Sequence, residues 1–165
     1  MKNLALSALT ADAFSAFGDV VDSTVVCDQY PINEGRTTRH HALSRVDCSN
    51  EDGEPVISIF RASPVEDGFV MHGMERHPLG SQTFVNLSPY PYAIVVAPVG
   101  EFDESKIVGF IARPQQSITY HRGTWHHYLL ALEGASDFVV IDRVGPGENC
   151  DEVALANPLK LSLPG

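Results

Sequence analysis

The chain of 165 residues is about the size of one domain, and its formal charge of −10 reflects 11 basic residues against 21 acidic ones. This balance excludes a nucleic-acid-binding protein, because phosphate contacts require clustered lysines and arginines. No apolar run approaches the roughly 18 residues that a membrane span requires. We therefore expect one globular domain over residues 1–165, with neither nucleic acid nor a membrane as its partner.

The N-terminus and the cysteines favour the cytoplasm. The N-terminal segment carries one lysine and reaches Asp12 without the apolar stretch or the cleavage site of a signal peptide. Cys27, Cys48 and Cys150 are odd in number and widely spaced, which fits neither a disulfide framework nor a CxxC metal site. We expect a reducing compartment.

One stretch has the pattern of a helix: Thr10 is a candidate N-cap, apolar residues at helical spacing follow over 11–17, and Gly18 is a stop. The later apolar segments are short, rich in β-branched and aromatic residues, and separated by turn residues. The expected strands are 56–61, 82–87, 92–97, 107–111, 128–132 and 137–142. Short strands at this spacing, without helical segments between them, favour an antiparallel barrel or jelly roll over a parallel sheet. We expect the tail, 148–165, to lie as a strap over the barrel or over a neighbouring subunit.

The histidines carry most of the functional information. All seven fall into three short clusters, namely His40 with His41, His72 with His77, and His121 with His126 and His127. A single histidine is more often a satisfied core or surface residue, but three clusters favour a shared polar pocket.

The second cluster leads into a candidate metal site. Side chains alternate along a strand, so Glu75 and His77 point to one side, and Gln82 begins the next strand after a turn. In the third cluster Gly123 predicts a turn, after which either His126 or His127 must face inward. Imidazole, carboxylate and amide ligands suit zinc, nickel, manganese or iron. The alternative is a hydrogen-bonded pair of Glu75 and His77 without metal.

Arg61 is a candidate for binding a substrate carboxylate. It lies on the same face of its strand as Ile57 and Ile59, so its guanidinium enters the pocket if that face is the interior. A structural ion pair with Asp142 or Glu75 is the alternative. The sequence Asp142-Arg143 closes a strand with charges, which is typical of a solvated strand end. Tyr120 and Trp125 are expected to pack in the wall of the pocket.

Two motifs carry a resemblance to a known family. The segments Met74-Glu-Arg-His-Pro-Leu-Gly-Ser-Gln-Thr-Phe84 and Tyr120-His-Arg-Gly-Thr-Trp-His-His127 resemble the paired signatures of ureidoglycolate lyases. The likeness extends to 13–20, 33–41, 58–62 and 137–142, and so covers nearly the whole chain. It implies an all-β, cupin-like double-stranded β-barrel with one short N-terminal helix, and it implies a homodimer.

The resemblance also implies a reaction and a set of roles. Members of the family cleave (S)-ureidoglycolate to glyoxylate and urea, as a step of allantoin degradation that consumes no water. The cupin metal pattern falls on Glu75, His77, Gln82 and His126, with Glu at a usual His position and Gln at a usual Glu position. These four residues would hold a divalent ion such as nickel, zinc or manganese, or the substrate itself. The clusters themselves motivate the remaining assignments: either His121 or His127 as the catalytic proton carrier, His72 in a supporting catalytic role, and Arg61, His41 and Asp142 as substrate contacts.

Two other classes of function compete with this one. A cupin-like protein that only binds a small carboxylate is one, although a regulator of that type usually brings a DNA-binding domain for which this chain lacks length and charge. Another metal-cupin enzyme, a dioxygenase or a sugar isomerase, is the second. The oxygen-rich ligand set suits proton chemistry better than iron oxygenation.

Overall fold

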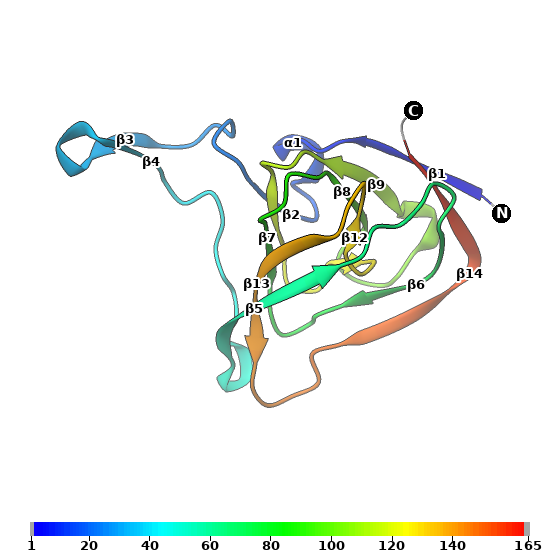
Figure 1. Cartoon of the computed structure of the whole chain (residues 1–165). Helices are drawn as coiled ribbons and strands as arrows, with labels where there is room; N and C mark the ends of the chain where they lie inside the picture. Colours follow the sequence, from blue (N-terminus) through cyan, green and yellow to red (C-terminus); the bar gives the residue numbers. More distant parts are fainter. Residues whose placement is uncertain (1, 164–165) are drawn as a thin grey trace.

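Six strands close into a barrel in the computed structural model, which describes residues 2–163 (Figure 1). Their order is β6, β14, β1, β9, β8 and β11, and β11 closes the ring by pairing with both β8 and β6. The bounds are β1 (Lys2–Ala8), β6 (Val70–Arg76), β8 (Tyr92–Ala97), β9 (Val108–Ala112), β11 (Trp125–His126) and β14 (Asp151–Ser162). The short β12 (Leu130–Ala131) also pairs with β8.

A five-stranded antiparallel sheet packs against one side of the barrel, in the order β2, β10, β7, β13 and β5. Its strands are β2 (Gly18–Val21), β5 (Glu54–Ala62), β7 (Gln82–Asn86), β10 (Ser117–Tyr120) and β13 (Ser136–Val144). The hairpin of β3 (Gln29–Ile32) and β4 (Thr37–His40) projects away from both layers (Figure 1). The helices are α1 (Ala11–Phe14) and three single 3₁₀ turns, η1 (Asn33–Gly35), η2 (Asn50–Asp52) and η3 (Glu104–Lys106).

Strand β8 explains how the two layers share one core. All six of its residues are buried, because Ala93, Val95 and Ala97 point into the barrel while the alternate residues point toward the sheet. The barrel interior is filled by side chains such as Met71 and Leu161. The candidate site therefore lies outside this apolar plug, in the layer between barrel and sheet.

The all-β, cupin-like prediction is confirmed, with corrections in detail. Helix α1 begins as predicted, since the Thr10 hydroxyl accepts from the Ala13 amide, but it ends at Phe14 rather than at residue 17. Strand β1 pairs in parallel with both β14 and β9, whereas purely antiparallel pairing was expected. The segment 128–132 forms only the two-residue β12.

The C-terminal tail is a barrel strand rather than a strap. Strand β14 lies between β6 and β1, so the two ends of the chain meet in one sheet. The sequence did not predict this strand, because a bulge between Ala154 and Leu159 interrupts the alternation of buried and exposed residues. The last two residues of the predicted tail lie outside the described residues. The organisation of 1–165 as one domain stays a prediction.

Between residues 2 and 163, none of the helices has the length and apolar character needed to cross a membrane.

The position of β14 predicts that the tail contributes to stability. Leu161 is fully buried inside the barrel, so Leu161→Ala should lower the free energy of unfolding by about 2–5 kcal/mol. Denaturation in urea measures this change. The exposed neighbour Lys160 supplies the control, and Lys160→Ala should change stability by less than about 0.5 kcal/mol. Equal, small effects of both substitutions would contradict the placement of β14.

Candidate active site

Three predicted metal ligands converge at the barrel closure. Glu75 is near the end of β6, and His126, on β11, is its direct partner in the antiparallel pair. His77 follows the end of β6, and its ring centroid lies 5.2 Å from that of His126. One ligand atom from each of the three residues lies within 4.8 Å of the others. Gly123, with a φ of 79°, makes the expected turn before β11.

The hydrogen bonds of the two imidazoles leave one nitrogen of each free. A carbonyl oxygen only accepts, so Nδ1 of His77 donates to Asn149 O at 2.7 Å, and Nδ1 of His126 donates to His127 O at 3.2 Å. The Nε2 atoms of both rings are buried and have no hydrogen-bond partner among residues 2–163. Histidines that ligate a metal typically donate their second ring nitrogen in this way. The residues present therefore fit a divalent metal.

Burial determines the charge of this cluster. Burial and, to a smaller extent, the neighbouring His77 lower the pKa of His126 to about 3. Burial raises the pKa of Glu75, an effect opposed by His77 and reinforced by Glu152. His126 Nδ1 and Glu75 Oε1 are 3.8 Å apart, but a neutral imidazole makes no ion pair. His126 is therefore in the neutral form that a metal requires.

Gln82 and Asp142 lie beside the cluster. Gln82 begins β7 as predicted, and its Nε2 donates to Asp142 Oδ2 at 3.3 Å. Gln82 lines a cavity of about 300 Å³, here named the inner cavity, together with Glu75 and His126. Asp142 lines a neighbouring hollow that His77 shares.

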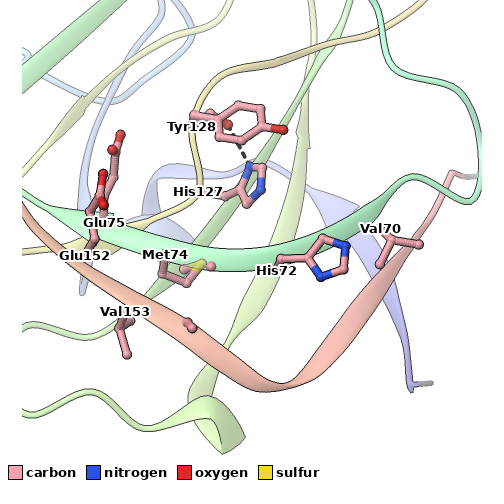
Figure 2. Close-up of a pocket in the computed structure, with 10 residues that line it drawn as sticks. Val70, His72, Met74, Glu75, His127, Tyr128, Glu152 and Val153 are labelled. Atoms are coloured by element: carbon pink, nitrogen blue, oxygen red, sulfur yellow. Dashed lines mark hydrogen bonds between the residues drawn. The ribbon is translucent and has the colours of Figure 1, made fainter.

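His127 and His72 line a second and larger space. This outer cavity, of about 570 Å³, is formed by β6, β14 and the segment His127-Tyr128 (Figure 2). Nδ1 of His127 donates to the Tyr128 carbonyl at 3.1 Å, which leaves Nε2 as the basic atom of a neutral ring. Burial lowers the pKa of His127. Glu75 lines both cavities.

Two predicted site residues lie elsewhere. Nε2 of His121 is 3.1 Å from Asp19 Oδ1, and the half-exposed ring lines a separate hollow. His41 follows the projecting hairpin, and its ring packs 5.8 Å from that of Tyr30. Neither residue lines the inner or the outer cavity within one chain.

The condition under which Arg61 would enter the pocket, that its face of β5 is the interior, is not met, and the alternative of a structural ion pair is observed with a different partner. Ile57 and Ile59 are 76% and 57% exposed, so the face of β5 that carries Arg61 is the outer one. The guanidinium binds both oxygens of Asp137 at 2.8 Å, and neither Asp142 nor Glu75 is its partner. Alternation places Phe60 inward instead, against Phe84. Arg61 nevertheless reaches the rim of the inner cavity.

The strand end at Asp142-Arg143 is not solvated as expected. Arg143 is buried, and its guanidinium donates to the carbonyls of Asn50, Glu51 and Pro146. This arginine therefore holds together the loops that contain Asn50 and Pro146.

Sequence reasoning assigned no chemistry to three residues that adjoin the cluster. Tyr120, expected as wall packing, stacks flat on His126 with ring centroids 4.4 Å apart and planes 6° apart, and so orients that ring. Cys150 and Glu152 each place a ligand atom within 4.8 Å of Glu75. Tyr120 could have been found from its place in the histidine motif, but nothing in the tail pattern marked the other two.

The lowered pKa of His126 predicts a pH dependence. Between pH 6.5 and about 3 the folded protein binds fewer protons at this ring than the unfolded chain does. The free energy of unfolding should therefore fall as pH falls through this window, by about 2 kcal/mol from this residue between pH 7 and 5. Urea denaturation with a chelator present, at both pH values, measures the loss, which His126→Asn should reduce by that amount. An unchanged pH dependence in the variant would contradict the prediction.

Comparison with known proteins places the chain in a family. Residues 1–162 match the family described as Ureidoglycolate lyase. The ureidoglycolate lyase of Burkholderia mallei (strain NCTC 10229) is 46% identical over 162 residues, which cover 98% of this chain and 95% of that protein. Those of Pseudomonas syringae pv. tomato and Pseudomonas entomophila are 46% and 45% identical over 153 residues, covering 92% of this chain and 89% and 91% of theirs. The chain belongs to the ureidoglycolate lyase family.

Proposed function

We propose that this protein is a lyase that cleaves (S)-ureidoglycolate to glyoxylate and urea in allantoin degradation. The observation that carries the proposal is that Glu75, His77 and His126, from two separate hairpins, come together beside two cavities. Nearly full-length relatives of this chain are named ureidoglycolate lyases. Nothing in the comparisons favours a binding protein or a different metal-cupin enzyme.

We also propose a divalent metal at this cluster, held by Glu75, His77 and His126, with the Gln82 amide oxygen as a fourth ligand. Support comes from the two buried, unpartnered Nε2 atoms. When bound, the ion would polarise the substrate hydroxyl and lower its pKa, as Lewis acids do. The stacked Tyr120 keeps the His126 ring in one orientation.

The reaction needs one proton carrier. The hydroxyl proton leaves as the carbonyl of glyoxylate forms, the carbon–nitrogen bond breaks, and a proton is delivered to the departing urea nitrogen. One base that takes the first proton can return it at the second step, so no water enters. Between the two histidines proposed as carrier, His127 is favoured, because it lines the outer cavity with a free Nε2, whereas His121 faces Asp19.

Product identity tests the reaction class. Racemic ureidoglycolate should yield equal amounts of urea and glyoxylate, measured with and without a chelator. A loss of turnover with chelator that nickel, manganese or zinc restores would support the metal. Release of ammonia would instead identify a hydrolase, and binding without turnover would favour the carboxylate-binding class.

Substitution of the cluster should abolish turnover. His77→Ala and His126→Ala should each lower kcat/KM by about 100-fold or more, which corresponds to about 2.7 kcal/mol in the barrier. The exposed Glu101, on the turn after β8, provides the control, since Glu101→Gln should retain activity. Turnover of either histidine variant within about threefold of wild type would show that the cluster is not the active site.

The third part of the proposal is a cytoplasmic homodimer. Free thiols at all three cysteines fit a reducing compartment. The outer face of the sheet is apolar, with Ile59 next to Val139 and Ile57 next to Ile141 in register. Val26, near the projecting hairpin, is 98% exposed. Exposed apolar rows of this kind are typical of an isologous interface.

Charges on this face should dissociate the dimer. Ile57→Glu combined with Ile59→Glu is expected to convert a dimer to a monomer in sedimentation experiments, because like charges would be buried opposite one another. Val99 is 54% exposed on the turn that follows the barrel strand β8, and Val99→Glu should leave the mass unchanged. A double variant that stays dimeric would refute this interface.

A further inference from the structure

The inner and outer cavities adjoin, because Glu75 and Tyr128 line both of them. A small molecule bound at the Glu75 cluster can therefore extend one end into each cavity. Figure 2 shows the outer cavity, with Glu75 and Glu152 side by side at one end and His127 and Tyr128 close by.

The outer cavity contains a pair of carboxylates. Glu75 and Glu152 are direct partners on the antiparallel strands β6 and β14, and a carboxylate oxygen of each lies within 4.8 Å of the other. Like charges opposite one another in a sheet are destabilising unless a third group relieves the repulsion. His126, whose Nε2 is buried and has no partner among residues 2–163, lines the inner cavity and not the outer one, and Glu75 connects the two.

The two cavities differ in charge. Of the described residues that line them, only Arg61, at the rim of the inner cavity, is a permanent cation, and Asp137 already pairs with its guanidinium. The outer cavity has the carboxylate of Glu152 instead. The ends of ureidoglycolate differ in the same sense, since one is an anionic carboxylate and the other is a neutral ureido group rich in N–H donors.

We propose that the outer cavity is the ureido subsite and that Glu152 is its specificity-determining residue, an inference that rests on the proposed function. The ureido N–H and one hydrogen of the terminal amide point the same way and form a fork that matches the two oxygens of a carboxylate. The substrate carboxylate then lies toward the inner cavity. The departing nitrogen lies on the side of His127, the proposed proton carrier.

The binding of each product separately tests this orientation. Glu152→Gln replaces one carboxylate oxygen with a donor, so it should raise both KM and the inhibition constant of urea by about tenfold, with glyoxylate inhibition changed less than about twofold. Glu152→Asp should lie between the variant and wild type. Glu101→Gln again serves as the charge-matched control. Metal content and melting temperature are measured on each protein.

Several outcomes would overturn the subsite. Two of them are an unchanged urea inhibition constant in Glu152→Gln and an equal weakening of urea and glyoxylate binding. The third is loss of bound metal from Glu152→Gln, which would make Glu152 a metal ligand together with Glu75 and Cys150. The proposed function fails separately, if wild-type protein releases no urea from ureidoglycolate. In that case a urea titration followed by NMR still reports on the cavity, because shifts in wild type that Glu152→Gln abolishes would retain the subsite without the reaction.

Discussion

The candidate active site depends on the pairing of two residues, Glu75 on β6 with His126 on β11. This pair is also where the six-stranded barrel closes, because β11 contributes only two residues and joins β6 to β8. A short strand held on both sides has little freedom to slide, and a shift by one residue would turn His126 away from the cluster and put its neighbour in its place. Stability of the barrel and geometry of the candidate metal ligands are thus set by the same hydrogen bonds.

The apolar plug of the barrel places the chemistry outside it. Small and branched side chains such as Ala93 and Val95 fill the interior, so polar groups are accommodated in the layer between barrel and sheet. There Tyr120, from the sheet, stacks on His126, from the barrel, and the carbonyl of Asn149 orients His77. Ligand atoms that come from different layers are held rigid by packing rather than by their own loops.

The inner and outer cavities adjoin but are lined by different charged residues. An arginine lies at the rim on one side, and a second carboxylate stands beside Glu75 on the other. In a chain with an overall charge of −10, the proposed orientation of a small polar ligand depends on such local differences rather than on the net charge. Glu152 helps to raise the pKa of Glu75, as a like charge on a neighbouring strand does.

The sequence alone determined the all-β fold class, the start of the helix, the turn at Gly123 and the residue types of the cluster, because these follow from local periodicity and from two long motifs. It could not decide which face of β5 is buried, since strand alternation defines two faces without naming the inner one; this is why the orientation of Arg61 stayed conditional. Nor could it place Cys150 and Glu152 beside Glu75. That neighbourhood exists only because β14 pairs with β6 across more than seventy residues of sequence, and such long-range pairing is decided by the packing of the whole barrel.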